Sequence, residues 1–144
     1  MTSVVYLVRH AEAEAGGHDA DRRLTSSGRA AFSGLLQVLG PKLAPNRILS
    51  SPSRRARETA SILALSTGAP AESSDDLASG HAGGRELLEL ARHAAAGTAL
   101  VGHNPELAEA VAIAAGKPLP VPPGTVAALD VSGPAPRLLW LRSP

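Results

Sequence analysis

The chain has 144 residues, a formal net charge of +1 and no cysteine. A chain of this length is typical of one domain, and we expect residues 1–144 to form a single domain. The lack of cysteine excludes thiol nucleophiles, disulfide scaffolds and cysteine-ligated metal centres. The near-neutral charge and the single Trp, Tyr and Phe argue against nucleic acid as a partner, because neither a basic field nor stacking platforms are available.

The first strand is expected over Val4–Val8, where every residue is apolar and most are β-branched. Such a run is typical of a strand that is covered on both faces in a parallel sheet. It is too short for a signal-peptide core or a membrane span, so we expect a cytoplasmic protein with no membrane partner. The strand ends abruptly in Arg9 and His10, which predicts that both side chains come to the edge of the sheet together.

Helices and strands alternate along the rest of the chain. The pattern predicts helices over 26–39, 52–65, 86–95 and 105–114, and strands over 47–51, 98–102, 125–131 and 137–142. We expect the first helix to use Thr25 as its N-cap, and the second to use Ser51 as its cap and Pro52 as its first residue. The last two strands flank the turn-forming segment SGPAP, which indicates a hairpin with Leu139 and Trp140 in the core.

This alternation predicts an α/β fold: a three-layer α/β/α sandwich with a mostly parallel central sheet and a C-terminal antiparallel hairpin. Ligands of such sheets bind beyond the carboxyl ends of the strands. Three predicted strand ends carry polar side chains, namely Arg9–His10, Ser50–Ser51 and Gly102–His103. We expect these three ends to form the functional site.

Three arginines follow the second strand, and helical spacing separates them. Arg54 lies four residues before Glu58, which predicts a surface ion pair, and Arg57 also falls on the solvent side. Arg55 falls beside the apolar stripe that should face the sheet, so we expect it to be partly buried near the helix N-terminus. A buried guanidinium needs an anion, which is either a substrate or an acidic residue of the fold paired with Arg9 and Arg55.

Four motifs together resemble a known family. They are LVRHAEAE at 7–14, RRLTSSGR at 22–29, SSPSRRARETA at 50–60 and LVGHNPEL at 100–107. In this order they resemble the histidine phosphatase superfamily, also called phosphoglycerate mutase-like, and most closely its short SixA-like phosphohistidine phosphatase branch. The resemblance implies the phosphoglycerate mutase-like fold with little or no cap, and an enzyme that uses no metal and no organic cofactor.

The resemblance also implies a role for each matching residue. His10 would be the nucleophile that becomes phosphorylated, Arg9 and Arg55 would bind the phosphoryl oxygens, and His103 would be the second histidine of the pocket. His10 must attack through a neutral ring nitrogen. We expect a hydrogen bond from its other nitrogen to the backbone to fix the tautomer, and the neighbouring arginines to lower its pKa.

The general acid that protonates the leaving group has several candidates. Larger members of the superfamily take it from the segment between the second arginine and the second histidine, which here offers Asp75, Asp76 and Glu86. Asp76, in SSDDLASG, matches the short branch best and is the predicted acid, while a solvated turn is the alternative role of this segment. His81 is a further candidate for the rim of the pocket.

The function predicted from these residues is hydrolysis of a phosphoryl group through a phosphohistidine intermediate. A protein phosphohistidine, for example on a histidine phosphotransfer protein, is the preferred substrate, because its P–N bond releases neutral imidazole once the ring is protonated. A broad phosphomonoesterase acting on small phosphate esters is the alternative within enzymes. A non-catalytic phosphohistidine-binding module is the alternative of another class, although it would not need His10. A histidine-ligated metal site would need closer histidine spacing.

Overall fold

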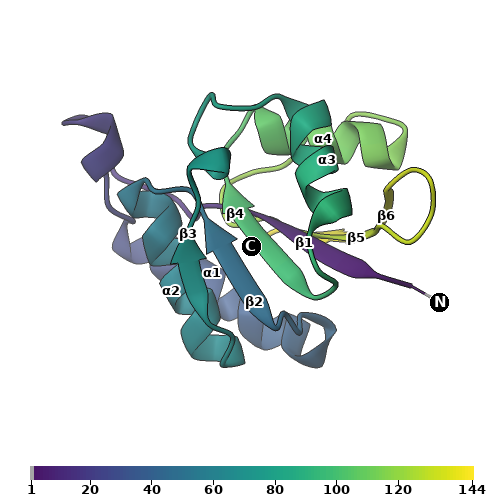
Figure 1. Cartoon of the computed structure of the whole chain (residues 1–144). Helices are drawn as coiled ribbons and strands as arrows, with labels where there is room; N and C mark the ends of the chain where they lie inside the picture. Colours follow the sequence, from purple (N-terminus) through teal and green to yellow (C-terminus); the bar gives the residue numbers. More distant parts are fainter. Residues whose placement is uncertain (1) are drawn as a thin grey trace.

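A six-stranded mixed sheet forms the centre of the computed structural model, which describes residues 2–144 (Figure 1). The strands are β1 (Val4–Arg9), β2 (Arg47–Ser50), β3 (Ala71–Ser73), β4 (Thr98–Gly102), β5 (Val126–Asp130) and β6 (Arg137–Arg142). Their order across the sheet is β3-β2-β4-β1-β5-β6. The first four of these run parallel, and β5 and β6 add the predicted antiparallel hairpin to the edge of β1.

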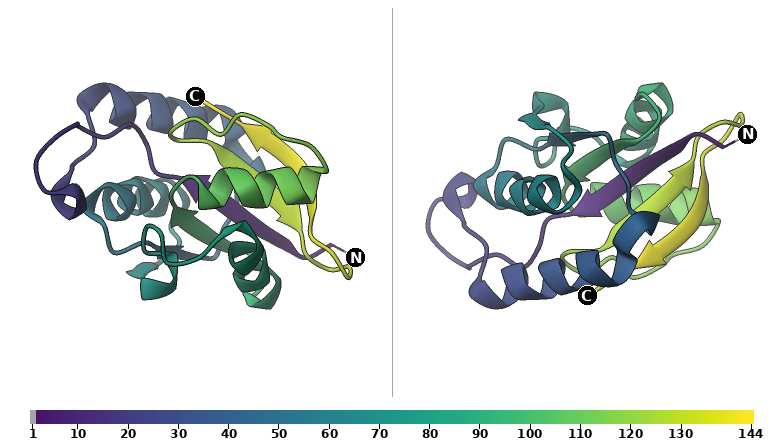
Figure 2. Two further views of the ribbon diagram at one scale, coloured as in Figure 1. Left: turned by 90° about the horizontal axis from the view of Figure 1, so that it is seen from above. Right: turned by 90° about the horizontal axis from the view of Figure 1, so that it is seen from below.

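Helices cover both faces of the sheet (Figure 2). The helices α1 (Ser26–Leu39) and α2 (Arg54–Thr67) lie on one face, and α3 (Gly84–His93) and α4 (Glu106–Ala115) lie on the other. The bounds of α3 and α4 fall within two residues of the predicted ones. This arrangement confirms the three-layer α/β/α sandwich. None of the helices in residues 2–144 combines the length and apolar character needed to cross a bilayer.

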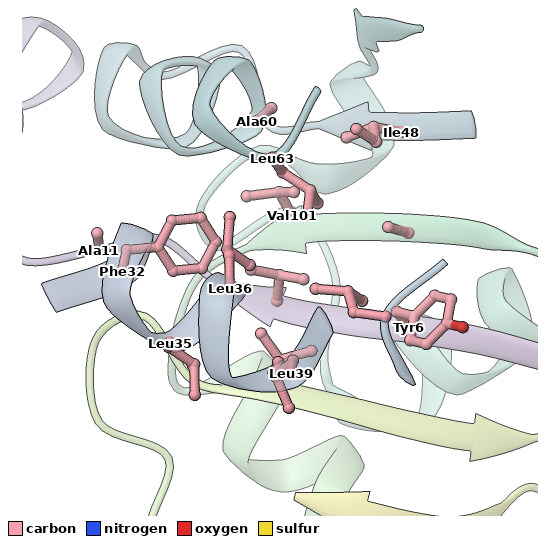
Figure 3. Packing of buried hydrophobic residues seen from close by; sticks show 14 of the residues in the cluster. Tyr6, Ala11, Phe32, Leu35, Leu36, Leu39, Ile48, Ala60, Leu63 and Val101 are labelled. Carbon is pink, nitrogen blue, oxygen red and sulfur yellow. The ribbon is translucent and has the colours of Figure 1, made fainter. Parts of the chain in front are cut away.

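The strand β1 lies between the two hydrophobic cores. Tyr6 and Val8 point to the core beneath α1 and α2, which is drawn in Figure 3. Val5 and Leu7 point to the core beneath α3 and α4. Because successive side chains of a strand alternate between the two faces, both cores hold β1 in one register. The backbone that carries Arg9 and His10 is therefore fixed from both sides.

The starts of α1 and α2 differ in how well the sequence predicts them. The Thr25 hydroxyl accepts a hydrogen bond from the Gly28 N–H at 2.9 Å, so the predicted cap of α1 is confirmed. The predicted start of α2 is wrong, because this helix begins at Arg54. Ser51 directly follows β2, and its N–H donates to the Val101 carbonyl of β4 at 2.9 Å. Its hydroxyl lies 2.7 Å from the His103 Nε2, and the N-cap position of α2 is taken by Ser53.

The C-terminal hairpin departs from prediction at one residue. The sequence places Leu139 in the core, but this residue is 42% exposed. Ala128 pairs with Trp140 and the next residue, Leu129, pairs with Leu138, so Leu139 is the extra residue of a β-bulge. Trp140 packs against the core beneath α1, with its ring centroid 6.3 Å from that of Tyr6. The bulge thus turns Leu139 outward, while Leu138 and Trp140 on either side of it pack against the two cores.

Candidate active site

The three predicted strand ends meet at one edge of the sheet. Arg9 is in register with Gly102, and the His10 N–H donates to the Gly102 carbonyl at 3.0 Å. Ser50 is in register with Val101 on the other side of β4. The parallel pairing of β1, β4 and β2 therefore brings their carboxyl ends together, as the sequence predicts.

A cavity of about 370 Å³ opens at this edge. Its lining combines all four residues to which the motifs assign a role with residues of the β1–α1 loop and of later loops. The lining residues are Arg9, His10, Glu12, Ala13, Asp19, Arg22, Arg55, Ser79, His103, Asn104 and Pro123. Most of them are polar or charged, so the cavity suits a small charged group.

His10 is held as a neutral imidazole. Its Nδ1 lies 2.7 Å from the Ala11 carbonyl oxygen, an acceptor, so Nδ1 carries the proton and Nε2 keeps its lone pair. The side chain is nearly buried, and burial, together with the positive charges of Arg55 and Arg9, lowers the pKa of His10 to about 4. At neutral pH, Nε2 is thus available as a nucleophile, and the expected backbone hydrogen bond is confirmed.

Two arginines place permanent positive charge beside His10. The Arg9 Nη1 donates to the Val121 carbonyl at 3.0 Å. Arg55, only 3% exposed, donates from Nη1 to the Asp19 carbonyl at 2.8 Å, and its Nη2 lies 3.4 Å from the Asp19 carboxylate. Arg55 is thus paired with an acidic residue of the fold. Arg9 forms no such ion pair with any residue in the range 2–144.

Each of these arginines keeps one buried donor unpaired. The Nε atoms of Arg9 and Arg55 and the Nδ1 of His103 are the buried side-chain nitrogens without a hydrogen-bond partner in the described part of the chain. All three belong to residues that line the cavity. Because an unpaired buried polar group costs free energy, such a concentration at one place indicates a site shaped for a ligand.

His103 faces His10 across the site. The two ring centroids are 5.3 Å apart, and the His103 Nε2 lies 2.7 Å from the Ser51 hydroxyl. Burial, followed by the charge of Arg55, lowers the pKa of His103 to about 4. Both histidines are therefore uncharged at neutral pH, and the positive charge of the cavity comes from its arginines.

The β1–α1 loop brings two charged residues that the sequence did not reveal. Asp19 lies in a short 3-10 turn, Asp19–Asp21, and its carboxylate is 3.1 Å from Arg22 as well as near Arg55. Arg55 is the main cause of a lowered pKa at Asp19. The only available signal was the position of Arg22 in the second motif, which by itself assigns no function.

The predicted acid candidates do not line this cavity. The Asp76 side chain is 66% exposed, and its Oδ1 is 4.0 Å from the His81 Nε2. These two residues border a separate depression together with Glu86. Asp76 also lines a small cavity that reaches His103, but none of the three residues lines the cavity that holds His10. Asp75 is also absent from that lining. The general-acid role of Asp76 therefore stays a prediction.

The geometry defines a class of chemistry. A neutral, buried imidazole beside permanently charged guanidinium groups is suited to attack phosphorus while the arginines hold the phosphoryl oxygens. Among residues 2–144, no three His, Asp or Glu side chains are grouped closely enough to hold a metal ion. The histidine and arginine side chains of this cavity have the features that phosphoryl transfer requires.

Comparison with known proteins identifies the family. The model of the histidine phosphatase superfamily (branch 1) matches residues 5–117, and the chain belongs to this superfamily. No curated protein matches the sequence significantly.

Solved structures of similar fold span nearly the full chain. A crystal structure of the candidate phosphohistidine phosphatase SixA from Agrobacterium tumefaciens has 26% identity and a TM-score of 0.85, covering 100% of this chain and 99% of that one. The protein histidine phosphatase SixA complexed with tungstate has 26% identity and a TM-score of 0.82, covering 98% and 97%. A mycobacterial glucosyl-3-phosphoglycerate phosphatase with inorganic phosphate, at 20% identity and a TM-score of 0.70, covers 98% of both chains and shares the fold.

Proposed function

We propose that this protein is a phosphatase that transfers a phosphoryl group to His10 and then to water, and that its substrate is phosphohistidine on another protein. The observation that carries the proposal is the state of His10. Its Nδ1 is tied to the Ala11 carbonyl and its ring is neutral, so Nε2 presents a lone pair beside two arginines with unpaired buried donors.

The first step is an attack of the His10 Nε2 on phosphorus. The P–N bond to Nε2 forms while the bond to the leaving group breaks, and the leaving group keeps that electron pair. Charge on the equatorial oxygens is stabilised by Arg9 and Arg55, whose Nε–H groups are the donors that the fold leaves unpaired. His103, adjacent to His10, is placed to contact the same oxygens.

The second step is the reaction of the phosphohistidine with water. Phosphorylation at Nε2 with a proton on Nδ1 makes the ring cationic, and the Ala11 carbonyl, 2.7 Å from Nδ1, stabilises that cation. Water attacks phosphorus, the His10 nitrogen regains its electron pair, and inorganic phosphate leaves. Two moderate barriers thereby replace one high barrier.

Two observations support phosphohistidine as the substrate. The two SixA structures are similar at 26% identity over nearly the whole chain. The predicted acid, Asp76, does not line the cavity, and the two carboxylates that do, Glu12 and Asp19, have lowered pKa values and hold no proton at neutral pH. A phosphate ester depends on a protonated acid more strongly than a phosphohistidine whose ring is already protonated. A phosphorylated histidine phosphotransfer protein is the partner that this chemistry favours.

The test compares His10→Ala with His18→Ala, because His18 is exposed and lies outside the cavity lining. Each variant is incubated with a phosphorylated histidine phosphotransfer domain and with a panel of small phosphate esters, and kcat/KM is measured. We expect His10→Ala to lose turnover and the covalent phosphoenzyme, and His18→Ala to keep both. Normal turnover by His10→Ala would contradict the nucleophile, whereas a strong preference for esters would establish the phosphomonoesterase instead.

A further inference from the structure

Glu12 stands between two cavities. It lines the cavity that holds His10, and it also lines an adjoining cavity of about 220 Å³ beside the start of α1. Among the lining residues, only Glu12 and Pro123 are shared by both cavities. Glu12 is two residues after His10, so the nucleophile and this carboxylate are carried by the same short segment. Glu12 therefore lies at the border between the cavity of the nucleophile and the adjoining one.

The carboxylate of Glu12 is fixed in place by α1. Its Oε1 accepts hydrogen bonds from the Thr25 hydroxyl at 2.7 Å and from the Ser27 hydroxyl at 2.8 Å. Its backbone carbonyl accepts from the Thr25 N–H at 3.0 Å, and a side chain at Gly28 would collide with that carbonyl. These contacts hold Glu12 in one position against the helix.

The negative charge of Glu12 is not used within the fold. Its Oε2 forms no hydrogen bond, and the residue forms no ion pair, with any residue in the range 2–144. The hydroxyls of Thr25 and Ser27 lower its pKa, which keeps it ionised. The other charged or titratable groups lining the cavity are Arg9, Arg22, Arg55, Asp19, His10 and His103. Asp19 differs from Glu12 because two of these arginines already pair with it.

A phosphohistidine substrate presents two opposite charges to this arrangement. Its phosphoryl group is anionic, whereas its ring, when the second nitrogen is protonated, is cationic and carries an N–H. Breaking the P–N bond returns the electron pair to the phosphorylated nitrogen, so a ring protonated on its other nitrogen leaves as neutral imidazole. An unprotonated ring would have to leave as the unstable imidazolate anion.

We propose that Glu12 accepts a hydrogen bond from the N–H of the substrate's imidazolium ring and so selects the protonated, reactive form of phosphohistidine. Glu12 gives up no proton in this role: the proton stays on the substrate ring while the P–N bond breaks. The proposal rests on the function proposed above and assigns its specificity for P–N over P–O bonds to one residue.

The experiment uses Glu12→Gln, with Glu14→Gln as its matched control. The amide oxygen of the introduced side chain still accepts from Thr25 and Ser27, so folding is preserved. Glu14 lies on the same loop, pairs with Arg23 at 3.1 Å and does not line the cavity. The full chain is assayed on a phosphohistidine peptide and on p-nitrophenyl phosphate, whose stable leaving anion needs no proton.

We expect Glu12→Gln to lower kcat/KM on the phosphohistidine peptide about tenfold, as for loss of one charge-assisted hydrogen bond. On p-nitrophenyl phosphate the change should stay within about twofold. The alkaline fall of kcat on the peptide should also move to lower pH, because the bound substrate ring loses its proton more easily without the carboxylate. Glu14→Gln should behave as the unaltered protein on both substrates.

Equal losses on the two substrates, or no loss on the peptide, would overturn the role of Glu12. Ser27→Ala gives an independent check, since it keeps the carboxylate and removes one of its two hydroxyl donors. It should reduce activity on the peptide selectively, but by less than Glu12→Gln does. If the unaltered protein hydrolyses neither substrate and forms no phosphoenzyme at His10, the proposed function itself fails, a result distinct from any change in the ratio.

Discussion

The carboxyl ends of β1 and β5 both carry buried charged groups, but these groups differ in how completely the fold pairs them with hydrogen-bond partners. At the end of β5, the Asp130 carboxylate accepts from the Ser132 N–H at 3.0 Å, the Ser132 hydroxyl at 2.7 Å and Arg137 at 3.2 Å. At the end of β1, the Arg9 Nε is buried without a partner. A fully paired buried charge serves the fold, whereas unpaired buried donors mark the place where a ligand completes the hydrogen bonds.

The topology explains this difference. β1 leaves the sheet through a loop. It does so at the edge where the parallel strands β4 and β2 also end. β5 turns back into β6 through a hairpin, so Asp130 meets its own neighbours in sequence. Asp130 is paired mainly by neighbours in sequence, with one longer bond from the Ser3 N–H at 3.4 Å, while the groups around His10 come from distant segments and face one another across a cavity.

The largest effect on catalysis is expected for Arg55→Ala, and Arg57→Ala is its control. Arg55 is buried in the cavity wall, whereas Arg57 is exposed two positions along the same helix. We expect Arg55→Ala to lower kcat/KM on the order of 10³-fold, because a guanidinium that holds the transferring phosphoryl group is lost. Arg57→Ala should leave kcat/KM nearly unchanged. Comparable losses in both variants would contradict the assignment.

Substitutions in the β5–β6 hairpin should change the free energy of unfolding and leave the catalytic activity unchanged. Leu129, on β5, is fully buried, so Leu129→Ala should lower the free energy of unfolding by about 2–5 kcal/mol. Leu139→Ala, at the exposed bulge, should cost about 0.5 kcal/mol or less. Chemical denaturation measures both values. A large loss for Leu139→Ala would show that the bulge residue is buried in solution.

The acid limb of the activity profile tests the state of His10. Its pKa of about 4 lies below the ordinary 6.5, so the nucleophile stays neutral from neutral pH down to nearly pH 4. With p-nitrophenyl phosphate, kcat/KM should fall about tenfold per pH unit below that value. The unfolded chain binds this proton already near pH 6.5, so stability should also decline as the pH falls from 6.5 toward 4. An acid limb centred near 6.5 would contradict a buried neutral His10.

The smallest effect is expected for Asp130→Asn. The bonds from Ser132, followed by those from Arg137 and Ser3, lower the pKa of Asp130 from 3.8 to about 2. The carboxylate therefore contributes stability above pH 3.8, and this contribution is lost as the pH falls through about 2. Thermal unfolding should show a lower Tm for Asp130→Asn at neutral pH, and this difference should shrink as the pH falls from 3.8 through about 2, with kcat unaffected. A difference that keeps its full size at pH 2 would contradict this account.

The features that could be predicted from the sequence are those that depend on neighbouring residues or on the order of helices and strands. The helix α1 spans the predicted residues Ser26–Leu39 and has the predicted Thr25 cap, because helix caps act within one turn of the chain. The apolar run before Arg9 predicted a strand covered on both faces. The strand ends were enough to predict that His10 and His103 come together, since parallel topology brings such ends to one edge, and helical spacing predicted that Arg55 is buried near them.

Long-range contacts decided the rest. Ser51 looks like a helix cap in sequence, but its contacts with Val101 and His103 hold it at the end of β2, and α2 begins three residues later. The return of the β1–α1 loop, which carries Asp19 to Arg55, has no periodic signal. The bulge at Leu139 arises from the register between two strands and is not visible in either strand by itself.

Gly28 joins the packing of α1 to the loop of the nucleophile. It is buried in the first turn of α1 and touches the backbone of Glu12, where any larger residue would displace that segment. In a survey of every substitution along the chain, this position would tolerate change as poorly as His10, although glycine carries no reactive group. Intolerance to substitution therefore does not by itself distinguish a residue that reacts from one that lets a reacting segment lie close.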